Sequence, residues 1–263
     1  MKAPAFAYAK PASLGEALEL LARPGAKILA GGQSLIPSLN MRLSAPELLV
    51  DVSGLRDLKG ISCKDGILSI GALTTHSEIE KSREIRTHAP LLAEAAPHVA
   101  HPAIRNRGTL GGSLALADPA AEYPACAVAL DAVLVLRNSR GERRVKAPEF
   151  FKGLFETDLK PDEILVAAEF PAAKKGDRSV FLELARRHGD YAIVGLAAVN
   201  SRFVFFAVGS NPEVIEGDSL QSTKDLLRSG LKPTADLYHS AETKRHLAGV
   251  LLERAWNTLS TSH

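Results

Sequence analysis

The segments Leu29-Ala30-Gly31-Gly32-Gln33-Ser34 and Thr109-Leu110-Gly111-Gly112-Ser113 each carry a pair of adjacent glycines close to a serine. In the first segment an apolar run ends at the glycines, which predicts a strand that delivers the chain into a tight turn. Because glycine has no Cβ, backbone N–H groups there can approach a phosphate closely and form an anion-binding nest. The second segment repeats this composition. Two such turns could clamp the two phosphates of a dinucleotide from opposite sides.

A single glycine pair is weak support for a phosphate site, because Gly-Gly followed by serine is most often an ordinary tight turn. Neither segment has the G-x-G-x-x-G spacing of nicotinamide-binding folds or the spacing of a P-loop. The sequence therefore disfavours these two common nucleotide sites, and the choice between a tight turn and another phosphate site stays open at this point.

Two acidic residues follow the second glycine pair. Asp118-Pro119 predicts the start of a helix, with Asp118 as the N-cap and proline at the first position. Glu122 is not needed as a cap, so its carboxylate can accept a hydrogen bond from a ribose hydroxyl. Tyr191 opens a later apolar strand after the residues 186–190, which are either a charged β-turn or part of a site where the tyrosine ring lies against a flat aromatic ligand.

The rest of the pattern mixes strands and helices without strict alternation. Ser13 and Glu16 have the spacing of a capping box, and Lys64-Asp65-Gly66 separates two apolar runs as in a tight hairpin. A polar stretch at 172–177 is the preferred domain boundary. Three apolar runs after it predict an antiparallel sheet, and two helical segments close the chain. This order favours an α+β fold over a doubly wound parallel sheet.

Composition excludes several classes of function. The chain has 263 residues and a net charge of +2, which is too balanced for nucleic acid or an anionic membrane as its main partner. It shows no signal peptide and no apolar stretch of the roughly 20 residues that span a bilayer, so a cytoplasmic protein is expected. The 8 histidines lack metal-ligand spacing, and the 2 cysteines, Cys63 and Cys126, cannot hold a four-cysteine cluster. Any electron transfer must therefore use a bound organic cofactor.

Five segments occur in an order and spacing that resemble one known family. They are Leu29 to Pro37, Ile70 to His76, Ile104 to Ser113, Ala117 to Glu122 and Arg186 to Ala192. Together they closely resemble the FAD-binding medium subunit of molybdenum hydroxylases, the family of carbon monoxide dehydrogenase and xanthine dehydrogenase. Each motif alone is weak, but five in register over about Phe6 to Gly209 are specific.

The resemblance implies FAD as the cofactor and an α+β fold. A vanillyl-alcohol-oxidase or PCMH-type FAD-binding domain would cover residues 1–174, with lobes at about 1–54 and 55–174, followed by a small C-terminal α+β domain over 175–263. The resemblance implies no catalytic side chain and no metal ligand. It implies contacts to the FAD pyrophosphate from Ala30, Gly31, Gly32, Gln33, Ser34, Thr109, Leu110, Gly111, Gly112 and Ser113, to the ribityl or ribose hydroxyls from Glu122, and near the isoalloxazine from Val99, Leu165 and Tyr191.

The implied function is electron relay within a molybdenum hydroxylase. The flavin would take electrons from a small iron–sulfur (2Fe–2S) subunit, which receives them from a large molybdopterin subunit, and pass them to an external acceptor; the complex would be a dimer of heterotrimers. A stand-alone flavin oxidoreductase and a non-catalytic, flavin-poor partner subunit are the alternatives. The chain departs from the family at a short hairpin around Asn200-Ser201-Arg202 and at Thr243, where an aromatic residue is common.

Overall fold

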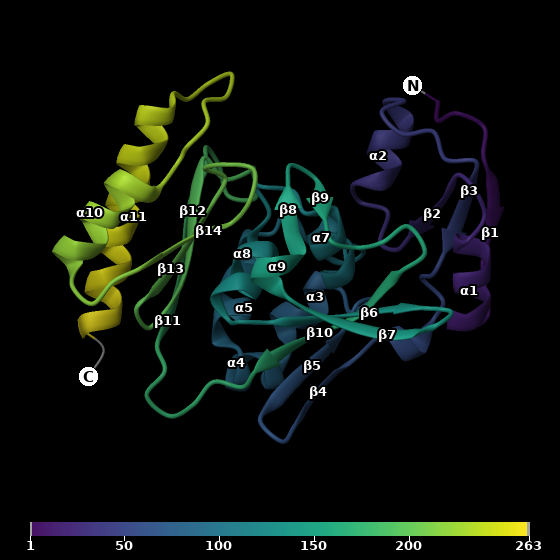
Figure 1. Cartoon of the computed structure of the whole chain (residues 1–263), viewed down its shortest axis with the longest axis horizontal. Coiled ribbons are helices and arrows are strands. Elements are labelled where there is room, and N and C mark those ends of the chain that lie inside the picture. The colour runs from purple at the N-terminus through teal and green to yellow at the C-terminus, as the bar shows by residue number, and fades with distance from the viewer. Residues whose placement is uncertain (1, 262–263) are drawn as a thin grey trace.

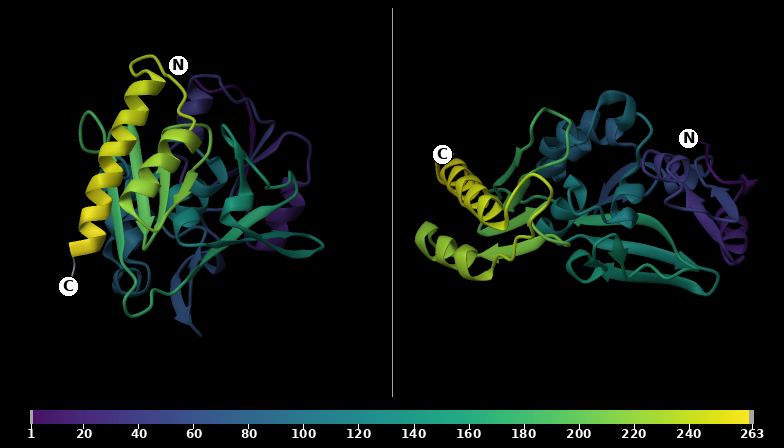
Figure 2. Two further views of the ribbon diagram at one scale, coloured as in Figure 1. Left: turned by 60° about the vertical axis from the view of Figure 1, so that its left-hand side comes forward. Right: turned by 90° about the horizontal axis from the view of Figure 1, so that it is seen from above.

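The computed structural model describes residues 2–261 and arranges them around three larger β-sheets (Figure 1). An N-terminal lobe in purple, a central lobe in blue and teal, and a C-terminal lobe in green and yellow follow one another along the longest axis of the molecule. Figure 2 shows the same order from above, with the N-terminal and C-terminal lobes at opposite ends. This mixture of sheets and helices confirms the predicted α+β class.

The N-terminal lobe is built on a three-stranded parallel sheet in the order β1-β3-β2. Its central strand β3 is buried along its whole length, which explains its continuous apolar run. The sequence pattern does not predict β1, because this edge strand is only three residues long and largely exposed. The elements of this lobe are β1 (Ala7–Ala9), α1 (Leu14–Leu21), β2 (Ala26–Leu29), α2 (Leu35–Asn40), β3 (Leu48–Asp51) and the 3-10 helix η1 (Arg56–Leu58).

The capping of α1 is only half of the predicted box. The hydroxyl of Ser13 accepts a hydrogen bond from the Glu16 backbone N–H at 3.2 Å, as expected for an N-cap. The Glu16 carboxylate, however, accepts from the Ala12 backbone N–H at 2.7 Å, one residue before the cap. Ser13 is therefore correctly placed as the N-cap, and the reciprocal bond is displaced by one residue.

The central lobe contains a five-stranded antiparallel sheet in the order β4-β5-β10-β6-β7. The predicted hairpin at Asp65-Gly66 is confirmed, since both residues have positive φ values, 50° and 77°. The strands are β4 (Ile61–Lys64), β5 (Ile67–Gly71), β6 (Val133–Asn138), β7 (Gly141–Lys146) and β10 (Ile164–Pro171), beside the two-stranded ribbon of β8 (Phe151–Gly153) and β9 (Glu156–Thr157).

Short helices of the central lobe pack against this sheet, with α7 on β5 and β10 and α9 on β6 and β7. Helix α3 ends at Lys81, and the hydroxyl of Ser82 then caps the next helix, α4, by accepting a hydrogen bond from the Ile85 backbone N–H. The helices are α3 (His76–Lys81), α4 (Arg83–His88), α5 (Pro90–Ala95), η2 (Ala96–His98), α6 (Pro102–Arg105), α7 (Leu110–Leu116), α8 (Glu122–Ala129) and α9 (Ala147–Phe150).

The prediction for Asp118 is wrong. Helix α8 begins at Glu122, with Ala121 in the N-cap position, and Asp118 lies in the preceding turn. Its side chain accepts a hydrogen bond from the Ala120 backbone N–H at 2.9 Å, which is a local Asx turn rather than a helix cap. Asx turns and N-caps use the same carboxylate-to-amide bond, so the sequence signal is common to both.

The C-terminal lobe is a four-stranded antiparallel sheet in the order β11-β12-β13-β14, which confirms the three predicted strands and adds β14. Alternate residues of β13 face opposite sides: Phe203 and Phe205 belong to the apolar cluster of α10 and α11, and Val204 and Phe206 belong to that of the central lobe. The elements are β11 (Ser179–Leu184), β12 (Val194–Val199), β13 (Arg202–Phe206), β14 (Glu213–Glu216), α10 (Leu220–Gly230) and α11 (Ala241–Thr261).

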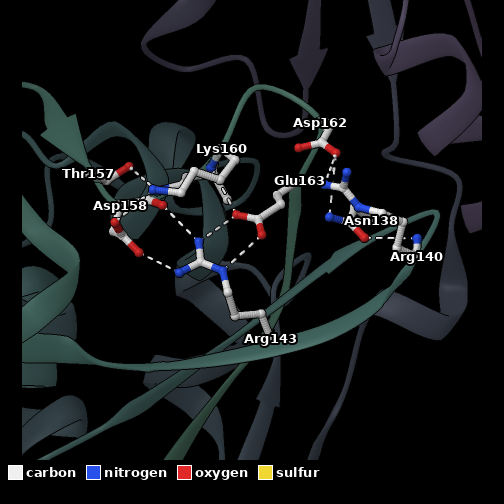
Figure 3. A network of polar contacts seen from close by, with 9 residues as sticks. Asn138, Arg140, Arg143, Thr157, Asp158, Lys160, Asp162 and Glu163 are labelled. Carbon is white, nitrogen blue, oxygen red and sulfur yellow. Dashed lines mark hydrogen bonds and ion pairs between the residues drawn. The ribbon is translucent and has the colours of Figure 1, made fainter.

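A polar network fastens the β6–β7 hairpin to the loop before β10 (Figure 3). The Arg143 guanidinium donates two hydrogen bonds to the Glu163 carboxylate, at 2.9 and 2.7 Å, and also pairs with the Asp158 carboxylate. These bonds hold the pKa of Asp158 at about 2, below its ordinary range, with Lys160 adding to the effect. The network is a structural clamp, because the arginine's donors are used by its own chain.

Candidate functional site

The first glycine segment is a turn with unused backbone donors. It follows β2, Gly32 has a φ of +73°, and the Gln33 side-chain amide donates to the Gly31 carbonyl at 3.0 Å. Among residues 2–261, no acceptor bonds the backbone N–H groups of residues 31–35. A run of consecutive free amides has the donor chemistry that binds a phosphate, so this segment fits the predicted anion site.

The second glycine segment differs from its prediction. It is the first turn of α7, with Thr109 as the N-cap, and not a loop. Its amides already have acceptors: Leu110 donates to the Thr74 carbonyl, Gly111 to the Ala72 carbonyl at 2.8 Å, and Gly112 to the Thr109 hydroxyl. The two glycine pairs therefore share a composition but not a conformation.

Close packing explains why position 111 is glycine. A Cβ added to Gly111 would lie 2.5 Å from the Ala72 Cβ and 2.8 Å from the Ala72 carbonyl oxygen. The missing carbon therefore makes room for the end of β5, and does not by itself open a path to a ligand.

The absence of a Cβ at Gly31 lets the two glycine segments lie close together. A Cβ on Gly31 would lie 2.1 Å from the carbonyl oxygen of Arg107, so only glycine permits the N-terminal lobe to contact the chain just before α7. A cavity of about 440 Å³ opens at this contact. It is lined by Leu29, Ala30, Gly31, Gly32, Gln33, Ile36, Pro37, Asp51, Ser53 and Arg107.

Arg107 is a site residue that the analysis of motifs does not single out. It lies inside one of the quoted segments, and its position in the cavity beside the free amides adds a positive charge to the anion site. A signal was available, because an arginine two residues before a glycine-rich helix start is a natural phosphate ligand. Asp51 and Ser53, also in the lining, could not be found in this way, since they follow a different strand and reach the cavity only through the parallel pairing of β2 with β3.

Glu122 and Tyr191 are brought to one place at the junction with the C-terminal lobe. Burial, and then the charge of Asp118, raise the pKa of Glu122 to about 7. Tyr191 is 74% exposed. Partial desolvation of its hydroxyl, followed by the charges of Asp118 and Glu122, raises the pKa of Tyr191, which shows that the hydroxyl lies near both acids. An exposed ring near two carboxyl groups suits a flat, hydroxyl-bearing ligand.

Val99 and Leu165 belong to the same core cluster of the central lobe, with exposed fractions of 9% and 6%. Val99 follows the 3-10 helix η2. Leu165 lies on β10 at an irregularity of its pairing with β6. Both therefore present apolar side chains from the central lobe, as a cofactor-lining role would need, and their contact with a cofactor remains a prediction.

No cluster of metal-ligating side chains occurs in the part of the chain that the structure describes, and His263 lies outside it. Both cysteines are free thiols. Within residues 2–261, none of the helices has the length and apolar composition needed to cross a membrane.

Residues 4–173 match the protein family described as the FAD binding domain in molybdopterin dehydrogenase. The chain belongs to this family. Its FAD cofactor and its membership of an oxidoreductase family, both predicted from the resemblance, are thereby confirmed. The anion site and the buried Glu122 fit an FAD molecule, which carries both phosphates and hydroxyl groups.

Relatives in this family cover almost the whole chain. The alpha subunit of the 6-hydroxypseudooxynicotine dehydrogenase complex of Paenarthrobacter nicotinovorans is 39% identical, over 97% of this chain and 94% of its own. The carbon monoxide dehydrogenase medium chain of Hydrogenophaga pseudoflava is 34% identical, over 97% of this chain and 96% of its own.

Solved structures agree with these relatives. Carbon monoxide dehydrogenase from Hydrogenophaga pseudoflava matches with a TM-score of 0.95 and 34% identity, over 99% of both chains. Quinoline 2-oxidoreductase from Pseudomonas putida 86 matches with a TM-score of 0.92 and 39% identity, over 99% of this chain and 98% of its own. The predicted family fold is confirmed over both the FAD-binding region and the C-terminal lobe.

Proposed function

We propose that this chain is the FAD-carrying electron-transfer subunit of a molybdenum hydroxylase complex. It would take electrons from a small 2Fe–2S subunit and pass them to an external acceptor. The observation that carries the proposal is the row of unbonded amides at residues 31–35, in a turn whose residues 31–33 line a cavity together with Arg107, in a chain of this family. Bound FAD would supply the chemistry of the relay, since it stores two electrons and can release them singly or together.

The chain's own residues would bind and orient the cofactor. The amides of residues 31–35 and the Arg107 guanidinium would hold the pyrophosphate, with hydroxyls at Ser34, Thr109 and Ser113 as further donors. Glu122 would accept hydrogen bonds from ribityl or ribose hydroxyls. Val99, Leu165 and Tyr191 would enclose the isoalloxazine from the central lobe and from the start of the C-terminal lobe. No side chain acts as a nucleophile in this proposal.

The partners follow from the names of the relatives. These are called the subunit of a dehydrogenase complex and the medium chain of a dehydrogenase, which supports a medium subunit working with a small iron–sulfur subunit and a large molybdopterin subunit. We propose a dimer of such heterotrimers, located in the cytoplasm. We also propose the division into residues 1–174, with lobes 1–54 and 55–174, and residues 175–263, because the family match ends at 173.

An absorption spectrum tests the cofactor site. The purified chain, incubated with FAD and freed of excess, should show flavin absorption bands at one FAD per chain. Arg107→Met should weaken FAD binding about tenfold or more, because a charge-assisted bond to a phosphate is lost. Arg56→Met, an exposed arginine at the start of η1, serves as the control and should leave binding unchanged. Equal affinity of both variants would show that the phosphate lies elsewhere.

Co-purification tests the relay. Tagged chain isolated from its native host should carry an iron–sulfur protein and a molybdopterin protein, and a substrate of the complex should bleach the flavin bands only when all three are present. If the chain is isolated alone and its flavin is reduced directly by a small organic substrate, the stand-alone oxidoreductase is the correct function.

A further inference from the structure

The carboxyl group of Glu183 is buried at the junction between the central and C-terminal lobes without a hydrogen-bond partner. Its side chain is 3% exposed, and its Oε2 atom receives no hydrogen bond from the described residues. A buried polar atom that lacks a partner lowers the stability of a protein, because its lost hydration is not replaced. Such an atom calls for an explanation outside the packing of the fold.

His98 is the nearest ionisable neighbour of Glu183. The His98 Nδ1 atom lies 3.7 Å from Glu183 Oε2, beyond hydrogen-bond distance. The His98 ring packs between Phe181 on β11 and His188 in the following loop, with ring centroids 5.0 and 5.6 Å away. The carboxyl group therefore lies against an imidazole held in place by two rings.

The two groups are both neutral near pH 7. Burial, together with the charge of Glu122, raises the pKa of Glu183 to about 8. Burial and the charge of His188 lower the pKa of His98. The neutral forms that burial favours carry no charges to attract each other across the 3.7 Å between Nδ1 and Oε2.

Glu183 contacts His98, and His98 adjoins segments that the proposed function places around the flavin. His98 directly precedes Val99, and His188 lies three residues before Tyr191. Gly189, in the same loop, packs so closely on Ala100 that an added Cβ would lie 2.8 Å from its carbonyl oxygen. Glu122 belongs to another segment that the proposed function places at the cofactor, and its charge helps to raise the pKa of Glu183.

Other ionisable groups at this junction have different surroundings. Glu94 on α5 is partnered, because its carboxylate accepts from the Phe181 backbone N–H at 2.9 Å and from the Ser179 hydroxyl at 3.2 Å. The buried Cys126 thiol on α8 has its pKa raised by burial, then by Glu122 and Glu94. Asp118 bonds the Ala120 backbone N–H. Of these acidic groups, Glu183 is the one with a buried carboxylate oxygen, Oε2, that receives no hydrogen bond within residues 2–261.

We propose that Glu183 sets the reduction potential of the bound flavin. In its protonated form Glu183 adds no negative charge to the pocket. In its ionised form it makes the flavin harder to reduce. This inference rests on the proposed placement of FAD. When two electrons enter the flavin from the iron–sulfur partner, their negative charge favours protonation of Glu183. A Glu183 that has lost its proton then takes one up from solvent water, and the two electrons remain on the flavin.

The test is a redox titration of FAD-loaded protein at several pH values. In the wild type, the midpoint potential should fall more steeply with pH over a range that begins near pH 8, where Glu183 starts to ionise in the oxidised protein. Glu183→Gln keeps the size and polarity of the side chain but cannot ionise. This variant should lack the steep range and have a higher potential than the wild type above it, with equal potentials at pH 6.

Two further variants isolate the effect. Glu253→Gln removes an exposed negative charge on α11, where Glu253 pairs with Lys224, and should behave as the wild type. Glu122→Gln should weaken FAD binding under the proposed function. A steep range that persists in Glu183→Gln, or that vanishes in Glu122→Gln while remaining in Glu183→Gln, would overturn the proposal.

A measurement without cofactor provides an independent readout. A carboxyl whose pKa is raised on folding lowers the stability of the fold as pH rises from its ordinary value of 4.5 to about 8. The melting temperature of Glu183→Gln should therefore exceed that of the wild type by an amount that grows between pH 5 and 8. A difference independent of pH would contradict the burial of a protonated carboxyl.

Failure of the wild type to bind FAD would refute the proposed function, whereas normal binding with unaltered potentials in Glu183→Gln would refute this inference alone.

Discussion

A single absent carbon atom decides whether the two glycine segments can meet. Gly31 lies where a Cβ would be 2.1 Å from the Arg107 carbonyl oxygen, a distance that no side chain tolerates. The glycine was predicted to leave room for a phosphate, and the structure assigns it first to the contact between lobes. The free amides of residues 31–35 all lie on the Gly31 side of that contact, since Arg107 and Gly108 donate to the Ile104 carbonyl.

Gly31→Ala should therefore damage both the contact and the cofactor site. We expect a loss of about 1–3 kcal/mol in unfolding free energy from overpacking, and at least a tenfold weaker affinity for FAD as the turn shifts. Urea unfolding and FAD titration measure these effects. Gly249→Ala, in α11 with open space around it, is the matched control and should gain about 0.5–1 kcal/mol through helix propensity. Unchanged FAD affinity in Gly31→Ala would contradict the role of this contact.

Among the secondary-structure elements, the β6–β7 hairpin depends on one arginine. Arg143→Ala would leave Glu163, whose side chain is 4% exposed, without its charged partner. Because Arg143 is itself 36% exposed and Glu163 still accepts from the Lys160 backbone N–H, we expect a loss of about 1–3 kcal/mol. Arg140→Ala removes a neighbouring arginine that is 78% exposed and paired with Asp162, and should change the unfolding free energy by less than about 1 kcal/mol. Equal losses in the two variants would show that the hairpin is held by other contacts.

The same network predicts a stability loss in acid. The pKa of Asp158 is lowered to about 2 in the folded chain from an ordinary 3.8, so its contribution is present above pH 4 and is lost as the pH falls toward 2. Because the Arg143–Asp158 pair is partly exposed to solvent, the contribution should stay below about 1 kcal/mol. Urea midpoints measured from pH 5 to 2 should fall less steeply for Asp158→Asn than for the wild type. Parallel curves would mean that the pair has no net effect.

Over the whole molecule, the central and C-terminal lobes share one core. Phe181 and Phe206 of the C-terminal sheet belong to the core cluster of the central lobe, packed against α5 and α8. Burial of such a side chain contributes about 1.5–3 kcal/mol. The predicted boundary at 174 therefore separates two chain segments whose apolar faces depend on each other.

A chain shortened to residues 1–174 should consequently expose part of this core. We expect strong binding of the dye ANS and a broad, weakly cooperative urea transition, compared with a single transition of the whole chain. The same measurement on a chain that carries Phe206→Ala should give an intermediate result. A shortened chain that unfolds sharply and binds no dye would show that the two lobes are independent domains.

Local sequence was sufficient to predict most elements and part of the site. The hairpin at Asp65-Gly66, the N-cap at Ser13 and three of the four strands of the C-terminal sheet follow from backbone preferences and alternation, which act between near neighbours. The family resemblance named the cofactor, which is confirmed. It also named the contact residues, which stay predictions although the structure gathers Glu122 and Tyr191 at one junction.

The tertiary structure alone decided which donors are free and which charges are buried. The segments at Gly31 and Gly111 look alike in sequence, yet only the first keeps its amides unbonded, because the second donates to the end of β5. Likewise, nothing in the local sequence distinguishes Glu183 from other strand glutamates, because its side chain is buried only by the packing of the lobes. Hydrogen-bond supply and desolvation depend on partners far along the chain, so the sequence determined the kind of cofactor site and the packing of three lobes determined its chemistry.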